Sequence, residues 1–248
     1  MEDLARVEEV SVIYKGVKAL DRVSLAFGKG EFVALIGPSG AGKSTLLRCL
    51  NRLIEPAEGR VVFRGQDITH ATGAALRHAR REIGMIFQNF NLVKRYPVIS
   101  NALAGRLGYL PTGPTLVGLF PTSDSTHAAQ TLERVGLKEK VFEKAANLSG
   151  GQQQRVAIAR ALMQSPALML ADEPVSSLDM ATAEVILDLM KRINEKDGVT
   201  VIVSLHDVNL AKRYADRIIG LRHGRLVFDA APDRWTPEAI QNLYWSEP

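Results

Sequence analysis

The clearest chemistry in the sequence lies in a glycine-rich segment, Gly37-Pro38-Ser39-Gly40-Ala41-Gly42-Lys43-Ser44, with Thr45 next. Glycines let a backbone wrap so closely that its N–H groups point at phosphate oxygens. A lysine at the seventh position can reach the outer phosphates, and a hydroxyl at the eighth can bind Mg²⁺. The segment lies between an apolar run and a stretch with helical spacing, which is the context such a loop needs. We therefore predict a polyphosphate site here.

Two adjacent carboxylates, Asp172 and Glu173, end a second apolar run at residues 167–171. Ligands of open α/β sheets bind at the carboxyl ends of the strands, so both acids are expected beside the glycine-rich loop. Asp172 would meet Mg²⁺ together with Ser44, and Glu173 could take a proton from an attacking water. Taken alone, the pair could equally include a helix-capping acid before Pro174. The glycine-rich loop favours the catalytic interpretation.

A third cluster, Leu148-Ser149-Gly150-Gly151-Gln152, has the composition of a helix start. Ser149 is suited to cap the helix, and the glycines leave backbone donors at its positive end open to an anion. A lone Ser-Gly-Gly would predict only an N-cap.

The segments around these clusters alternate between strand-like and helix-like patterns, which indicates an α/β fold. Buried strands are predicted at residues 31–36, 167–171 and 200–205, and helices at residues 44–53 and 182–194. A small antiparallel sheet beside the main one is predicted from the short runs at residues 7–14, 17–27, 60–64 and 83–87. Residues 216–221 and 226–228 predict a final hairpin that turns at His223-Gly224.

The strand pattern fades between residues 96 and 146. Helices are predicted at residues 97–107 and 127–135, around a loop at residues 111–125 that is rich in Pro, Gly, Thr and Ser. We predict one domain over residues 1–248. Residues 1–95 and 161–248 would form the core with its antiparallel β subdomain, and residues 96–160 an inserted α-helical subdomain that carries the third cluster.

Composition sets the broad class. Hydrophobic residues make up 46% of the chain and charged residues 23%, which is typical of a globular protein. The single cysteine, Cys49, excludes an intrachain disulfide, and its place on a predicted helix favours packing over nucleophilic chemistry. The N-terminus lacks the pattern of a secretory signal, and no window predicts a membrane span. The net charge is only +4, and the Lys and Arg residues are scattered along the sequence, which favours a solvated surface over a nucleic-acid interface.

Together and in this order, the three clusters resemble those of the ATP-binding-cassette (ABC) family over nearly the whole chain. The resemblance implies a P-loop NTPase core of the RecA-like type that binds ATP and Mg²⁺ and hydrolyses ATP. It implies that Tyr14 stacks on adenine, that Gln88 meets Mg²⁺ and the attacking water, and that His206 lies near the γ-phosphate.

The same resemblance implies that the chain works with partners. Ser149, Gly150, Gly151 and Gln152 would hold ATP bound by a second copy, and Asp179 would link the two sites of this homodimer. The dimer would bind two integral membrane permease subunits and, through them, an extracytoplasmic solute-binding protein, with no nucleic acid involved. We therefore expect a peripheral protein on the cytoplasmic face of a bacterial inner membrane.

Two other hypotheses compete with a transporter ATPase: a non-transport cassette, in DNA repair or on the ribosome, and a simple nucleotide kinase. A DNA-repair or chromosome protein of this family would carry a long coiled coil, and this chain has no heptad run. A ribosome-acting member usually has two cassettes, and this chain has one of each motif. A simple nucleotide kinase would leave residues 149–160 unexplained. The transporter ATPase is the best hypothesis.

The cargo is harder to predict, because the ATPase does not touch it. Cassettes that are not fused to a membrane span most resemble those of bacterial importers. The short stretch after His206 leaves no room for the C-terminal regulatory domain that is seen in the ATPases of sugar or methionine importers. The segments at residues 86–93, 115–120, 148–163 and 171–179 are most similar to the phosphonate-importing branch of the family. Uptake of phosphonate or a related phosphorus oxyanion is expected, with phosphate or a small polar amino acid as the alternative.

Overall fold

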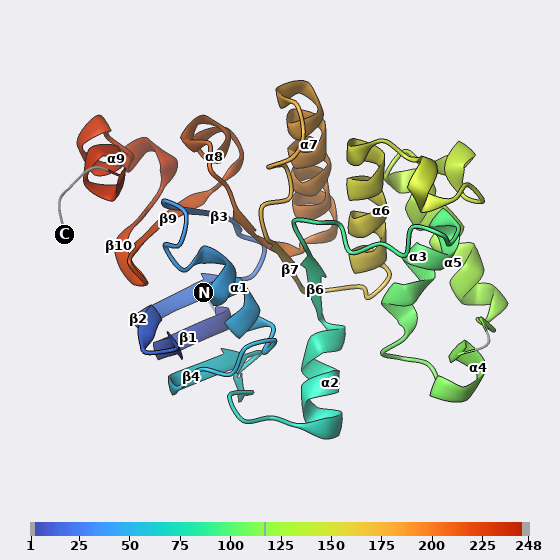
Figure 1. Ribbon diagram of the computed structural model, residues 1–248, viewed down its shortest axis with the longest axis horizontal. Coiled ribbons are helices and arrows are strands. Elements are labelled where there is room, and N and C mark those ends of the chain that lie inside the picture. Colours follow the sequence, from blue (N-terminus) through green and yellow to red (C-terminus); the bar gives the residue numbers. More distant parts are fainter. Residues whose placement is uncertain (1–2, 117, 245–248) are drawn as a thin grey trace.

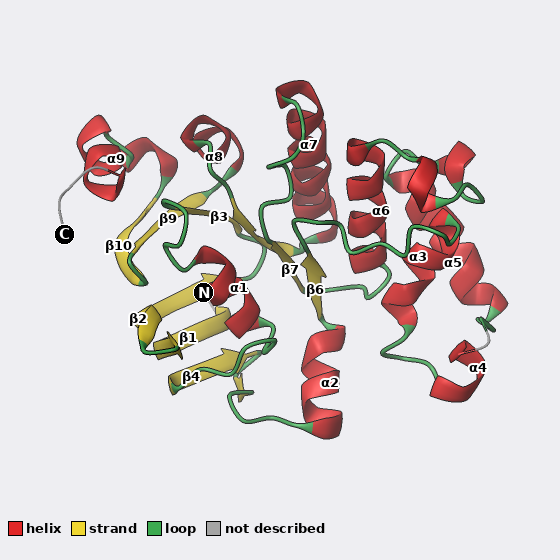
Figure 2. Cartoon of the chain, in the orientation of Figure 1, coloured by secondary structure: helices red, strands yellow, loops and turns green. Residues whose placement is uncertain are grey.

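The computed structural model describes residues 3–116 and 118–244, whose strands form two sheets (Figure 1). Met1, Glu2, Val117 and residues 245–248, which belong to the predicted domain, lie outside the described residues. Figure 2 shows the smaller sheet on one side of the main sheet and a group of helices on the other.

The main sheet has six strands in the order β10-β9-β3-β8-β7-β6. The five strands from β9 to β6 pair in parallel, and β10 joins the edge antiparallel to β9. Their bounds are β3 Phe32–Ile36, β6 Ile83–Ile86, β7 Leu168–Ala171, β8 Thr200–Ser204, β9 Arg217–Arg222 and β10 Arg225–Ala230. The parallel pairing places the carboxyl ends of these strands at one edge of the sheet.

The smaller sheet is antiparallel, in the order β2-β1-β4-β5. It consists of β1 Asp3–Tyr14, β2 Val17–Gly28, β4 Glu58–Phe63 and β5 Gln66–Asp67. A turn at Lys15-Gly16 joins the two long strands, and both residues adopt the positive φ angles that a tight hairpin requires.

The main sheet is covered on both faces, since alternate residues of a strand point to opposite sides. In β3, Phe32, Ala34 and Ile36 pack into a core formed with the helices α6 (Gly150–Leu162), α7 (Met180–Asp197) and α8 (Val208–Tyr214). Val33 and Leu35 pack into a second core with the helix α1 (Lys43–Leu50) and the small sheet. The α/β fold predicted from the sequence is therefore confirmed.

Nine α-helices are assigned within the described residues, and several are short. Their bounds are α1 Lys43–Leu50, α2 Gly73–Arg81, α3 Val98–Leu103, α4 Thr112–Leu116, α5 Thr122–Arg134, α6 Gly150–Leu162, α7 Met180–Asp197, α8 Val208–Tyr214 and α9 Pro237–Tyr244. Short 3₁₀ turns cover Ala104–Arg106 (η1), Lys138–Lys140 (η2), Ala145–Asn147 (η3) and Pro232–Arg234 (η4). The connection from β6 to β7 consists of helices and loops and contains α3 to α6 (Figure 1).

One strand assignment from the sequence is wrong. Residues 83–87 were expected in the antiparallel sheet, but β6 is the edge strand of the main sheet and pairs in parallel with β7. All four residues of β6 are buried, and such a run without alternation is typical of a parallel strand covered on both faces.

The predicted loop at residues 111–125 is also partly helical. It contains α4, and α5 begins at Thr122, five residues before the helix expected at 127–135. Pro121 precedes the first turn of α5, a position that proline tolerates because no helical hydrogen bond needs its nitrogen. The helices α2, α8 and α9 were not predicted, since each is short and lacks a long hydrophobic periodicity.

Cys49 packs in the core between α1 and the small sheet and is fully buried. Burial raises the pKa of its thiol to about 12. A thiol that stays protonated at neutral pH is a poor nucleophile, so the interpretation of Cys49 as a packing residue fits its surroundings.

Gly105 in η1 is expected to be essential for the contact between η1 and α6. A Cβ atom there would lie 2.1 Å from the carbonyl oxygen of Arg160 and 2.8 Å from Cβ of Met163. Gly105→Ala should therefore lower the free energy of unfolding by about 1–3 kcal/mol, measured by urea denaturation. Gly113→Ala is the control, because a Cβ atom there meets nothing within 4 Å. Equal stability of the two variants would contradict this packing argument.

Candidate functional site

The glycine-rich loop joins β3 to α1 through backbone conformations that only glycine adopts without strain. Gly37 has a φ of 151° and Gly42 a φ of 104°. A Cβ atom at Gly37 would lie 2.1 Å from the carbonyl oxygen of Leu221, and one at Gly42 would lie 2.6 Å from that of Ala19. The neighbouring strands therefore require glycine at both positions. The turn between them consists of Pro38, Ser39, Gly40 and Ala41, and Thr45 lies within α1.

Lys43 begins α1 and turns its amine back onto this loop. The Nζ atom donates to the carbonyl oxygens of Gly37, at 2.7 Å, and Pro38, at 3.1 Å. Burial lowers the pKa of Lys43, while the negative charges of Glu173 and Asp172 oppose that shift. The loop therefore holds a buried cation next to two acids. The carbonyl oxygens that accept hydrogen bonds from this cation could be replaced by those of an incoming phosphate.

The end of β7 supplies a buried carboxylate to the start of α1. Asp172 is 3% exposed, and its Oδ1 atom accepts hydrogen bonds from Ser44 Oγ at 2.7 Å and Ser204 Oγ at 3.3 Å. The hydroxyl and the carboxylate that the sequence predicts as metal ligands are therefore in contact.

Glu173 lies beside this pair in a strained conformation. Its φ of 49° is in the left-handed region, which residues other than glycine rarely adopt, and strain of this kind clusters at functional sites. Its backbone N–H donates to Ser204 Oγ at 2.8 Å. One carboxylate oxygen lies 2.6 Å from His206 Nε2, and the other accepts from Gln88 Nε2 at 3.0 Å. The structure thus brings together the three residues predicted to be catalytic, from the ends of β6, β7 and β8.

A small cavity of about 160 Å³ opens beside this cluster. Its polar lining includes Glu173, Ser204 and His206, and its apolar lining comes mainly from the segment that leads into α7 and from α8. Glu173 and His206 are therefore within reach of water.

The third cluster, at residues 148–152, forms the start of α6 as a complete capping box. Ser149 Oγ accepts from the backbone N–H of Gln152 at 3.3 Å, and the Gln152 side chain accepts from the backbone N–H of Ser149 at 3.0 Å. The predicted N-cap is therefore confirmed. Gly151 lies so close to α7 that a Cβ atom there would come within 2.5 Å of Thr182 Cγ2, and a Cβ atom at Gly150 within 3.2 Å of Leu178 Cδ2.

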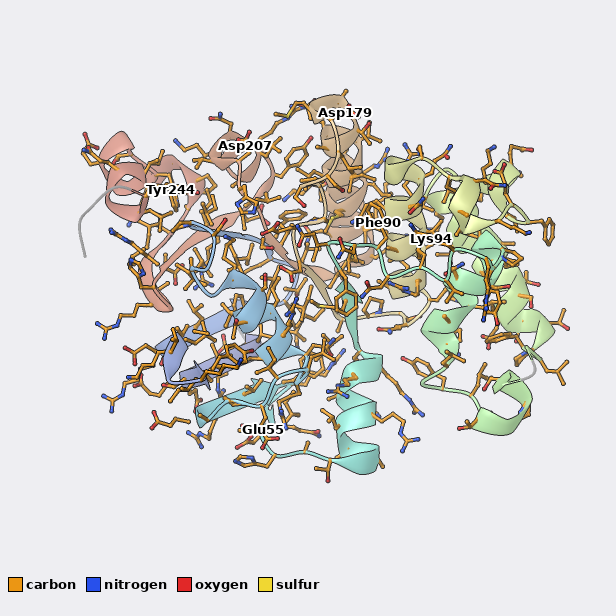
Figure 3. The ribbon with its side chains drawn as sticks, viewed as in Figure 1. Glu55, Phe90, Lys94, Asp179, Asp207 and Tyr244 are labelled. Carbon is orange, nitrogen blue, oxygen red and sulfur yellow. The ribbon has the colours of Figure 1, made fainter. Side chains whose placement is uncertain are left out.

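Asp179 caps the start of α7 next to the start of α6. Its carboxylate accepts from the backbone N–H of Thr182 at 2.9 Å and from Thr182 Oγ1 at 2.7 Å. Figure 3 shows Asp179 at the upper edge of the view, where α7 starts. Asp179, Ser149 and Met180 are all exposed, so the starts of α6 and α7 form one accessible surface.

The predicted site residues do not all meet within one chain. Figure 1 shows α1 and α6 on opposite sides of β6 and β7, so the third cluster is separated from the glycine-rich loop. Tyr14 ends β1 and is 46% exposed, with its ring open to a ligand.

Sequence analysis missed Ser204, the last residue of β8. Its hydroxyl is fully buried and links the Asp172 carboxylate to the backbone of Glu173. The only signal was a hydroxyl at the end of a mostly apolar strand, two residues before His206, and such a residue usually bonds to nearby backbone.

This arrangement matches a known family. A family model described as "ABC transporter" matches residues 20–176, which include the glycine-rich loop, the third cluster and the two acids. The chain belongs to the ABC transporter family. It is therefore an ATPase cassette, and the enzyme class expected from the sequence is confirmed.

Curated relatives match almost the whole chain. A phosphonates import ATP-binding protein (PhnC 1) of Halalkalibacterium halodurans is 51% identical over 97% of this chain and 94% of its own length. The corresponding protein of a Bacillus cereus strain is 53% identical over 95% and 92%, respectively.

Solved cassettes share the ABC fold of this chain. A post-hydrolysis dimer of the cassette MJ0796 bound to ADP and Pi has a TM-score of 0.79 at 36% identity, covering 92% of this chain and 98% of that one. A nucleotide-free cassette from an ABC transporter has a TM-score of 0.83 at 29% identity, covering 98% and 95%. The predicted P-loop NTPase core with its β subdomain is thus confirmed.

Within residues 3–116 and 118–244, no helix of this ABC protein combines the length and the hydrophobicity that crossing a bilayer requires.

The lysine of the loop provides a direct test of the site. Lys43→Ala should reduce ATP hydrolysis by about 10²–10³-fold, because it would remove the cation that is predicted to neutralise the transferred phosphate. Phosphate release measured at saturating ATP checks this expectation. Lys138→Ala is the control, since Lys138 is exposed and pairs with Glu133 in the helical region. Wild-type turnover in Lys43→Ala would refute the assignment of the loop.

Proposed function

We propose that this chain is the ATP-hydrolysing subunit of an importer for phosphonate or a related phosphorus oxyanion, and that it works as a homodimer. The observation that carries the enzymatic part is the contact between Ser44 Oγ and Asp172 Oδ1, at 2.7 Å, with Glu173 beside it. The glycine-rich loop, the proposed metal-binding pair and the proposed base are therefore adjacent.

Each residue of this cluster has a proposed task in hydrolysis. The loop N–H groups and Lys43 would bind the β- and γ-phosphates of ATP. Glu173 would accept a proton from the attacking water, and Gln88 would orient that water. His206, 2.6 Å from Glu173 in this structure, would turn to the γ-phosphate when nucleotide binds. Tyr14 would stack on the adenine ring.

The donor set of the site fits Mg²⁺. Ser44 offers a hydroxyl, Asp172 a carboxylate and Gln88 an amide oxygen, all hard oxygen donors of the kind that Mg²⁺ prefers. A magnesium site for a nucleotide normally has only one or two protein carboxylates, because phosphates and water complete it. When bound, the ion would neutralise charge on the β- and γ-phosphates. Ser44 and Asp172 would hold it, and Gln88 would face it.

The dimer is proposed because one chain leaves its site incomplete. The exposed starts of α6 and α7 present Ser149, Gly151 and Asp179 on a surface separated from Lys43 (Figure 1). In a head-to-tail pair, Ser149 and Gly151 of the second copy would reach the γ-phosphate, with Gly150 and Gln152 shaping the same helix start. The similar cassette MJ0796 is dimeric, which supports this arrangement.

The cargo is proposed from the relatives. The proteins from H. halodurans and B. cereus are named phosphonates import ATP-binding proteins and share half of their residues with this chain over nearly its whole length. By this likeness, the dimer would bind two permease subunits at the cytoplasmic face of the membrane. The helical subdomain proposed for residues 96–160 would pass motion to them. A solute-binding protein would deliver the cargo outside.

The assigned base has a specific signature. Glu173→Gln should retain ATP binding but lower turnover by about 10²–10⁴-fold, because an amide cannot accept the proton. An ATP-bound dimer should then accumulate and elute early in size-exclusion chromatography with Mg²⁺ and ATP. Glu184→Gln, at an exposed ion pair with Arg213, is the control and should stay monomeric during turnover. Unchanged turnover in Glu173→Gln would reject Glu173 as the base.

The cargo assignment predicts a growth phenotype. Deletion of the gene should abolish growth on phosphonate as sole phosphorus source and leave growth on phosphate intact. The wild-type gene should restore growth and the Glu173→Gln gene should not. Loss of growth on phosphate or phosphite instead would reassign the oxyanion. Normal phosphonate uptake in a strain with no second importer would exclude phosphonate and would leave the ATPase assignment standing.

A further inference from the structure

The buried carboxylate of Asp172 has two oxygen atoms with different surroundings. Oδ1 is satisfied by the hydroxyls of Ser44 and Ser204. Oδ2 faces Arg48, whose Nη2 atom lies 3.5 Å away. A carboxylate with 5% of its side chain exposed needs a compensating positive charge. Lys43 attracts it from nearby, but the lysine amine is bonded to the loop carbonyls, so Arg48 is the cation in ion-pair contact.

One helix supplies both partners of this carboxylate. Ser44 and Arg48 are four residues apart in α1 and therefore lie on the same helix face. The serine contacts one carboxylate oxygen and the arginine contacts the other. The Arg48 side chain is 46% exposed, so the guanidinium can leave Asp172 for solvent without losing its hydration.

We infer that Arg48 is a positioning residue that occupies the Asp172 carboxylate in the metal-free enzyme and competes there with the divalent cation. The inference rests on the Mg-ATP site proposed above. A divalent ion held by Ser44 and Asp172 would bring two positive charges close to the guanidinium, which opposes its binding. Arg48 therefore orders the Asp172 carboxylate before the cation binds and weakens the hold on the cation, which favours release after hydrolysis.

The test measures how much Mg²⁺ strengthens nucleotide binding. The probe is a fluorescent, non-hydrolysable ATP analogue, MANT-AMP-PNP, titrated into the full-length protein in EDTA and again in Mg²⁺. The dissociation constant in EDTA divided by that in Mg²⁺ gives the coupling between the metal and the nucleotide. In Arg48→Met this ratio should rise about fivefold above wild type, because a like charge is removed from the metal site. The metal-free variant should also melt at a lower temperature, because Asp172 loses its counter-charge.

Two further variants separate charge from other effects. Arg48→Lys keeps the positive charge and should retain the wild-type ratio. Arg213→Met removes an exposed arginine of α8 that pairs with Glu184 of α7. This variant should keep the wild-type ratio of dissociation constants and the wild-type change in melting temperature when the metal is removed. If Arg48→Met does not fold, Arg48→Gln provides the same loss of charge with a polar side chain.

The outcomes point to different assignments. An unchanged or reduced ratio in the neutral variants would overturn the role of Arg48, and so would an equal rise in Arg48→Lys. If the wild-type protein binds the analogue no better with Mg²⁺ than with EDTA, the proposed metal site itself is wrong.

Discussion

Parallel pairing of the central strands is the constraint on which the site depends. Because β3, β6, β7 and β8 run in the same direction, their carboxyl ends meet at one edge of the sheet. Residues more than a hundred positions apart, such as Ser44 and Asp172, come into contact there. The strands also bury both of their faces, so the edge is rigid and the functional side chains can be placed accurately without loops of their own.

The second constraint is electrostatic. The edge brings Lys43, Asp172 and Glu173 into a poorly solvated region, where each charge must find a partner. The lysine is held by loop carbonyls, the aspartate by two hydroxyls and Arg48, and the glutamate by Gln88 and His206. Each charge at this edge is therefore compensated within the chain itself.

Most of the main-sheet strands and the long helices could be predicted because their patterns are local. The buried runs before Gly37 and Asp172 and the amphipathic α7 have clear lengths and boundaries. The edge strand β6 was assigned to the wrong sheet, because a run of four residues is too short for its lack of alternation to distinguish a parallel from an antiparallel strand. The short helices α2 and α8 were missed, since fewer than three turns give little periodicity and tertiary contacts stabilise them.

The sequence by itself determined the chemistry: the loop glycines, Lys43, the acids after β7 and the helix cap at Ser149 are recognisable because their roles depend on residue type and short spacing. Only the tertiary structure decided which of them meet. It placed Gln88, Glu173 and His206 in one cluster, recruited Ser204 and Arg48 to Asp172, and kept the α6 start apart from α1. The physical reason is that contacts between residues distant in the chain follow from strand order and packing, and short-range patterns do not encode these.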